Sequence, residues 1–138
     1  MIAGKRHRGF PVTALSGADF AEKWLTVTAL PSSEEGVLVL RVVGEVDLAT
    51  VGLLREYLHK HLAQGHRGLV LDCTEVSFLA ASGIGLLVEI AAQARAEGVA
   101  LRLVSQSRLV LRALELTETN DLVPRTATVA QAVAQCST

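Results

Sequence analysis

The chain has 138 residues, half of them hydrophobic and 4% aromatic, and a formal net charge of −1. This length suffices for one domain with a core that needs no disulfide or metal, and the near-zero charge disfavours nucleic acid and anionic membranes as partners. The two cysteines, Cys73 and Cys136, have no ligand-like spacing, so we expect a reducing cytoplasm and neither a cofactor nor a metal site.

The first 22 residues mix Gly, Pro, Ser and a basic run, Lys5–Arg8, without any period. This pattern predicts a flexible arm over residues 1–22, followed by one folded domain over 23–138. The basic run could contact an acidic partner, although a solvated tail is the favoured interpretation. We find neither a secretory signal nor an apolar stretch long enough to span a membrane, so we expect a cytoplasmic protein without membrane insertion.

Two strands are predicted first. Leu25, Val27 and Ala29 alternate with threonines, which is typical of a half-exposed strand. The segment 31–36 then breaks the chain with Pro, Ser and Gly. Residues 37–43 are apolar on both faces except at Arg41, so we expect a hairpin whose second strand is central.

Helices and strands then alternate. Apolar spacing predicts helices over about 49–64 and 82–97, each ending before a glycine, with a short buried strand, Leu69–Leu71, between them. A strand follows over 100–104, then a helix opened by Ser105–Ser107, and Thr128 can cap a last helix ending near Ala134. The predicted fold class is α/β, with a small mixed, mostly parallel sheet of four or five strands flanked by about four helices.

An enzyme is not expected. The histidines His7, His59, His61 and His66 are predicted on the surface, and no nucleophile can be matched to them by spacing. The turn Gly83–Gly85 matches neither dinucleotide-binding nor P-loop spacing.

Two loops remain, both after inner strands, at the edge of an α/β sheet where binding sites collect. The first, Gly44–Asp47, carries Glu45 and Asp47, and Asp47 either caps the next helix or serves a partner. The second, Phe78–Gly85, places Ser82 at a helix start, where it is either an ordinary N-cap or a hydroxyl positioned for phosphate; the N-cap is favoured.

These motifs together resemble the STAS domain of anti-sigma factor antagonists. A strand ends in Gly-Glu-Val-Asp, and another ends in Leu-Asp and is followed by Val-Ser-Phe-Leu-x-x-Ser-Gly-Ile-Gly-Leu-Leu. The resemblance covers about Trp24 to Ala134. It implies the STAS fold, a small mixed sheet flanked by helices.

The resemblance also implies a function. In such antagonists the unmodified protein binds an anti-sigma factor that is also a serine kinase, which releases a sigma factor. Phosphorylation at the start of the second helix reverses the binding, because a phosphate adds about −1.5 to −2 charge to the interface. The partner-binding residues that it implies are Glu45, Asp47, Leu79, Ala80, Ala81, Ser82, Gly83 and Ile84.

This chain departs from the family at the switch. The family's turn reads Asp-Ser-Ser/Thr-Gly, so its acidic residue corresponds to Ala80, the modified hydroxyl to Ala81 and the second hydroxyl to Ser82. Either Ser82 is the phospho-acceptor, as the only credible candidate, or the antagonist cannot be switched off by its kinase. We favour the second hypothesis.

Alternatives are a STAS subunit of an ABC-type lipid-transport complex, which need not be phosphorylated, and, with much less weight, a redox switch between Cys73 and Cys136. We expect a monomer or a weak dimer.

An exposed apolar interface is sought at Leu79, Ile84 and Leu86, although burial is favoured beyond the first turn of the helix.

Overall fold

The structure, a computed structural model, describes residues 23–136. The predicted arm, residues 1–22, lies outside this range, as do residues 137–138. One mixed sheet has the order β1-β2-β3-β4-β5, with β1 antiparallel to β2 and the other neighbours parallel. The strands are β1 (Leu25–Pro31), β2 (Val37–Val46), β3 (Gly68–Leu79), β4 (Ala100–Val104) and β5 (Arg125–Thr126). The helices are α2 (Val51–Leu62), α3 (Ala81–Glu97), α4 (Arg108–Leu116) and α5 (Val129–Cys136).

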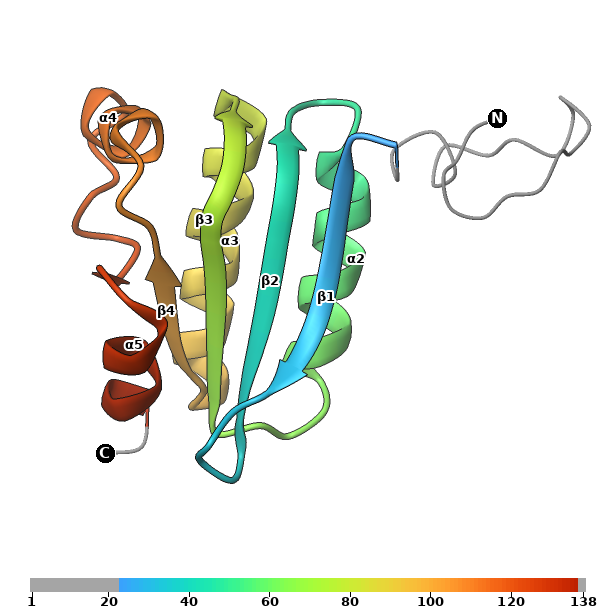
Figure 1. Cartoon of the computed structure of the whole chain (residues 1–138), viewed down its shortest axis with the longest axis vertical. Coiled ribbons are helices and arrows are strands. Elements are labelled where there is room, and N and C mark those ends of the chain that lie inside the picture. Colours follow the sequence, from blue (N-terminus) through green and yellow to red (C-terminus); the bar gives the residue numbers. More distant parts are fainter. Residues whose placement is uncertain (1–22, 137–138) are drawn as a thin grey trace, which may run out of the picture.

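The predicted hairpin and crossovers are confirmed. Alternation in β1 follows from its position at the sheet edge, whereas β2 lies between two strands and is apolar on both faces. The helices α2 and α3 connect parallel strands and lie behind the sheet in Figure 1. The last two helices begin as predicted, because the Ser107 and Thr128 hydroxyls accept hydrogen bonds from the N–H groups of Val110 (3.4 Å) and Gln131 (3.1 Å).

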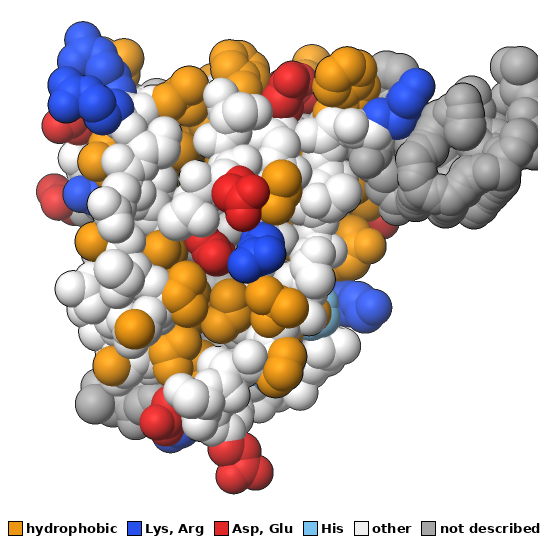
Figure 2. All heavy atoms as spheres, viewed as in Figure 1, with side chains coloured by type: hydrophobic (Ala, Val, Ile, Leu, Met, Phe, Trp, Pro, Cys, Tyr) orange, Lys and Arg blue, Asp and Glu red, His pale blue; other side chains and the backbone are white. Residues whose placement is uncertain are grey.

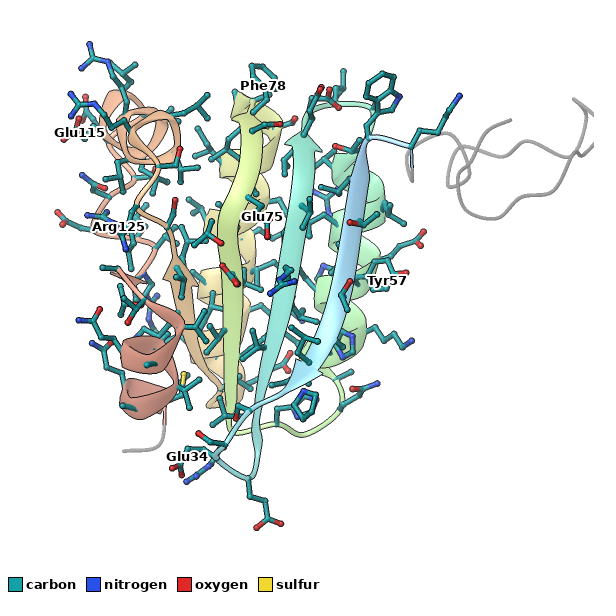
Figure 3. The ribbon with its side chains drawn as sticks, in the orientation of Figure 1. Glu34, Tyr57, Glu75, Phe78, Glu115 and Arg125 are labelled. Atoms are coloured by element: carbon teal, nitrogen blue, oxygen red, sulfur yellow. The ribbon has the colours of Figure 1, made fainter. Side chains whose placement is uncertain are left out.

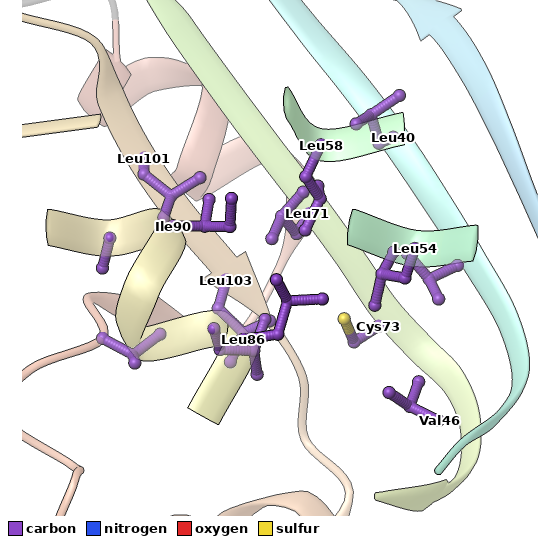
Figure 4. Close-up of a cluster of buried hydrophobic side chains, with 14 of the residues drawn as sticks. Leu40, Val46, Leu54, Leu58, Leu71, Cys73, Leu86, Ile90, Leu101 and Leu103 are labelled. Carbon is purple, nitrogen blue, oxygen red and sulfur yellow. The ribbon is translucent and has the colours of Figure 1, made fainter. Parts of the chain in front are cut away.

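The main core lies between the sheet and the helices α2, α3 and α4. Its centre consists of leucine and isoleucine side chains that are almost fully buried (Figure 4). They include Leu40, Leu58, Leu71, Leu86, Ile90 and Leu103. A second, smaller cluster lies on the other sheet face under α5, with Val39, Val70, Val104 and Ala132. The aliphatic composition is therefore used to fill both faces of one thin sheet.

Strand β3 is much longer than expected. The sequence interpretation ended it at Leu71 and assigned no strand to the residues that follow, but the strand continues to Leu79 beside an extended β2. The ladder passes from Arg41↔Asp72 to Val43↔Glu75 and shifts again between Gly44 and Glu45. Each shift inserts an extra residue in β3, so its buried side chains recur every third residue and the period-two signal is lost.

Candidate functional site

The two loops singled out in the sequence meet at the carboxyl edge, the sheet edge where β2, β3 and β4 end (Figure 1). Val46 and Leu79 are ladder partners, and the Ala80 N–H donates to the Val46 carbonyl at 2.8 Å. The Ser77 hydroxyl donates to the Gly44 carbonyl at 3.2 Å. Gly44–Val46 and Phe78–Leu79 were predicted as loop but belong to strands, so hydrogen bonds hold this edge together.

Gly44 brings the start of β1 to the same edge. Its φ of +120° lies where residues with a Cβ are strained, and a Cβ there would collide with the Trp24 carbonyl oxygen. That oxygen accepts a hydrogen bond from the Glu45 N–H at 2.9 Å. Gly44 thus allows two backbones to approach closely and places Trp24 beside the end of β2.

Asp47 organises the turn into α2. Its Oδ1 accepts hydrogen bonds from the N–H groups of Ala49 (2.9 Å) and Thr50 (3.1 Å). The fully buried Thr50 donates its hydroxyl to the Glu45 carbonyl at 2.7 Å and accepts from the Asp47 N–H at 3.0 Å. The N-cap of α2 is Thr50, whose side chain makes no capping hydrogen bond, so Asp47 does not cap the helix itself; it holds the turn that precedes the helix, with Thr50 as a partner that the sequence interpretation missed.

Replacement of Asp47 by alanine is expected to lower the free energy of unfolding by about 1 kcal/mol, since two N–H groups lose their acceptor. Asp47→Asn keeps an acceptor oxygen and should lose only a fraction of this. Urea unfolding of the two variants checks the expectation. Equal stability of Asp47→Ala and the parent chain would show that the hydrogen bonds of this turn contribute nothing.

Ser82 is not the helix cap. The cap position belongs to Ala80, whose extended backbone (ψ 170°) precedes α3 and whose carbonyl accepts from the N–H groups of Gly83 (2.9 Å) and Ile84 (3.1 Å). Ser82 lies inside the first turn, where its Oγ is buried and has no hydrogen-bond partner. Ala81 is exposed. The N-cap prediction is wrong because the cap lies two residues earlier, at Ala80, and α3 already begins at Ala81.

The first turn of α3 packs tightly on the strand ends. A Cβ on Gly83 would lie 2.6 Å from Val46 Cγ1 and 2.7 Å from Leu79 Cδ1, so only glycine fits this approach. Leu79, Ile84 and Leu86 are 9%, 5% and 0% exposed, respectively. An exposed interface is therefore wrong for Leu79 and Ile84, whereas the burial favoured for Leu86 is confirmed, and all three side chains belong to the core.

Other apolar side chains are exposed instead. Leu48 is 84% exposed, Trp24 49%, Phe78 46% and Leu109 42%. We call these four residues the apolar rim, since they come from the start of β1, the turn after β2, the end of β3 and the start of α4. Figure 2 shows hydrophobic side chains along the upper margin, over the carboxyl edge, and Figure 3 places Phe78 there. No local signal marked Phe78, because the extra residues in β3 break the alternation and leave both Ser77 and Phe78 exposed.

The described histidines lie elsewhere. His59 Nε2 contacts Glu89 Oε2 at 3.2 Å between α2 and α3, and hydrogen bonds from Arg55 and His59 lower the pKa of Glu89. His61 was expected on the surface but is buried, with its Nδ1 3.0 Å from Gln64 Oε1. His7 lies outside the described residues. The histidines of α2 occur at its C-terminal end, away from the carboxyl edge where the helix begins.

The cysteines are both free and lie in different hydrophobic clusters. Cys73 belongs to the main core with Leu54 and Ile90 (Figure 4), whereas Cys136, the last residue of α5, packs in the smaller cluster on the opposite sheet face. The sheet separates the two thiols, so the folded chain cannot form the disulfide that the redox alternative requires. Burial, with a smaller effect of Asp72, raises the pKa of Cys73 to about 12, and burial also raises that of Cys136.

Cys73 is expected to resist thiol reagents near pH 8 in the folded protein, because the thiolate is the reactive form. Its pKa is higher in the folded chain than the ordinary value of 9.0, so this thiol stabilises the fold fully below pH 9 and loses that effect as pH rises toward 12. Labelling with and without urea, read by mass spectrometry, tests the first statement. Native labelling of Cys73 as fast as in urea would contradict it.

Within residues 23–136, no group of three or more His, Cys, Asp or Glu side chains is arranged to hold a metal ion. No helix in this range is both long and apolar enough to cross a membrane.

Comparison with known proteins identifies the family. The STAS domain model matches residues 32–132, so the chain belongs to the STAS domain family. It is 34% identical over 62 residues to the anti-sigma-F factor antagonist RsfB of Mycobacterium tuberculosis, an alignment that covers 45% of this chain and about half (51%) of that relative.

Solved structures agree with the fold. The crystal structure of an anti-sigma factor antagonist from Mycobacterium paratuberculosis aligns with a TM-score of 0.72 at 25% identity, over 82% of this chain and 96% of that one. The antagonist SpoIIAA in its unphosphorylated form aligns at 0.65 and 20% identity, over 80% and 95% of the two chains. The predicted STAS fold is confirmed. These relatives are named for antagonism of an anti-sigma factor and not for a catalysed reaction.

Proposed function

We propose that this protein is an anti-sigma factor antagonist that binds an anti-sigma factor of the serine-kinase type and thereby releases a sigma factor. The observation that carries the proposal is the carboxyl edge, where the start of α3 and the end of β2 meet beneath exposed apolar side chains. The names of the similar antagonists support the same function. The protein would act in the cytoplasm, as a monomer or weak dimer.

The apolar rim would supply most of the binding energy. Exposed apolar residues surrounded by polar groups are typical of protein-binding surfaces, and a few such residues usually dominate affinity. Leu48 is the most exposed of the rim residues and adjoins the turn held by Asp47. Of the residues implied by the resemblance, Glu45, Asp47, Ala80 and Ala81 would contact the partner, whereas the buried Leu79, Gly83 and Ile84 would position the turn.

Regulation would differ from the family's switch. Ala81 occupies the position of the modified hydroxyl and is exposed, but it has no oxygen to accept phosphate. Ser82 has a hydroxyl, but this oxygen is buried, and a kinase must reach the atom it modifies. We therefore favour an antagonist that its kinase does not switch off at this turn and that is controlled by abundance or another signal.

The alternative is a STAS subunit of an ABC-type lipid-transport complex. The lack of an exposed hydroxyl at the start of α3 is compatible with a complex that needs no phosphorylation. Neighbouring genes distinguish the two: a serine kinase or sigma factor supports the antagonist, and a permease with an ATPase supports the transport subunit.

The decisive experiment measures binding of the full chain to the anti-sigma kinases of its host. Leu48→Ser and Phe78→Ser are each expected to weaken the complex by about tenfold or more, because an anchoring side chain is lost from the interface. Leu122→Ser is the matched control, since Leu122 is also exposed but precedes β5, at the other side of the sheet from β1. Equal losses for all three variants, or binding to none of the kinases, would refute the proposal.

A further inference from the structure

A groove lies on the sheet face opposite α2 and α3, between α5 and the β1–β2 hairpin. This open groove has a volume of about 530 Å³, within the range of roughly 300–1,000 Å³ typical of small-molecule sites. One wall is α5 and the other is the end of β1 with the turn that follows it. The groove is separate from the carboxyl edge, so the inference drawn from it does not depend on the proposed function.

The floor and one wall of the groove are apolar. Leu30 and Val39, which are ladder partners, lie beside Val129 and Val133 of α5. Figure 2 shows hydrophobic side chains across the lower half of this face, with a cation between acidic groups above them. An apolar floor that ends at charged groups suits a ligand with one apolar and one charged end.

The charged end of the groove is formed by Arg41 and Asp72. They are ladder partners on the parallel strands β2 and β3, whose backbones lie about 4.8 Å apart. Asp72 is 7% exposed, and its Oδ1 accepts from the Thr74 N–H (3.2 Å) and hydroxyl (2.8 Å). Among residues 23–136, Asp72 Oδ2 accepts no hydrogen bond and the exposed Arg41 guanidinium makes neither a hydrogen bond nor an ion pair.

Both groups are therefore available although they are adjacent. A guanidinium binds a carboxylate through two parallel hydrogen bonds, and a carboxylate oxygen accepts from an ammonium group. Side by side, they match a molecule that carries an ammonium group and a carboxylate on the same carbon atom. Glu75, on the same face (Figure 3), and Glu34 at the far end of the groove add negative charge, which disfavours phosphates and other polyanions.

We propose that this groove binds a free α-amino acid with an apolar side chain. The ligand carboxylate pairs with Arg41, its ammonium group pairs with Asp72 Oδ2, and its side chain lies on Leu30, Val39 and α5. A monocarboxylate or a monoamine of the same shape satisfies only one of the two charged groups and leaves the other without a partner.

The test is an amide NMR titration of the full chain with L-leucine. Saturable shifts are expected at the backbone amides of Val39, Arg41, Asp72 and Val133. The analogues 4-methylpentanoate and 3-methylbutylamine, which lack the ammonium and the carboxylate respectively, should bind about tenfold more weakly or worse. L-aspartate, with a second negative charge and no apolar side chain, should produce no saturable shift.

Two variants locate the site. Arg41→Gln and Asp72→Asn should each weaken leucine binding by about tenfold or more, while Arg112→Gln, an exposed change on α4, should leave it unchanged. Asp72→Asn keeps an oxygen for Thr74, and the spectra themselves report whether each variant is folded. Lack of groove shifts at millimolar leucine, equal binding of leucine and 4-methylpentanoate, or shifts that follow protein concentration and so indicate a second copy in the groove, would each overturn the proposal.

Discussion

Ala81→Glu is expected to weaken binding to the anti-sigma factor by about 30-fold or more, since it buries an unpaired carboxylate in the interface. The free energy of unfolding should not fall. Ala81 is exposed and is the first residue of α3, where a negative charge interacts favourably with the helix dipole by about 0.3–1 kcal/mol. Calorimetric titration with the partner and urea unfolding measure the two opposite effects.

Ala92→Glu is the matched control, because Ala92 is also exposed on α3 but lies in its middle, away from the carboxyl edge. It should leave affinity unchanged. If both variants bind as tightly as the parent chain, the start of α3 does not contact the partner.

A second substitution at the same position tests phosphorylation by the kinase separately from affinity for the anti-sigma factor. Incubation of Ala81→Ser with the kinase and ATP should place phosphate at position 81, whereas the parent chain should remain unmodified at this turn. Phosphate found on Ser82 of the parent chain by mass spectrometry would refute the hypothesis that the kinase does not switch this antagonist off. This holds even if the carboxyl edge binds the partner as proposed.

Gly44→Ala is expected to lower the free energy of unfolding by roughly 3 kcal/mol or more. The added Cβ meets the Trp24 carbonyl, and the φ of +120° is strained for any residue other than glycine. The hydrogen bond from the Glu45 N–H to this carbonyl would also be disturbed. Because β1 loses its attachment at the carboxyl edge, partner binding should fall as well.

Gly52→Ala is the control for this change. Gly52 lies in α2 with nothing within 4 Å of an added Cβ, so alanine should stabilise the helix by about 0.5–1 kcal/mol. Urea unfolding of both variants gives the comparison. Similar stabilities would mean that the close approach of β1 and β2 at Gly44 is not required.

Much of the candidate site follows from residues that are close in sequence. Asp47 and Thr50 form their hydrogen bonds within one turn, so a turn held by an aspartate just before a helix could be predicted from neighbouring letters alone. The meeting of the two loops could also be predicted, because parallel strands end at a common edge. Both statements need only local spacing and the general geometry of parallel sheets.

The exposure of each side chain could not be predicted in this way. A shift of one residue in the start of α3 turned Ser82 inward and left Ala81 outside, and periodicity locates helix ends only to within a residue or two. The two extra residues in β3 remove the period-two pattern from the outer half of that strand. Neither this half of the strand nor the exposure of Phe78 could therefore be predicted.

The α/β class, the order of the elements, the hairpin and the edge at which the two motifs meet all follow from local apolar periodicity and turn residues. The folded structure was needed to show that the Ser82 hydroxyl is buried, that Leu48 and Phe78 are exposed, that the cysteines lie on opposite sheet faces, and that Arg41 and Asp72 share one groove. These features depend on strand register and on the rotation of each helix toward the sheet. Both are decided by contacts between distant residues, which no local window contains.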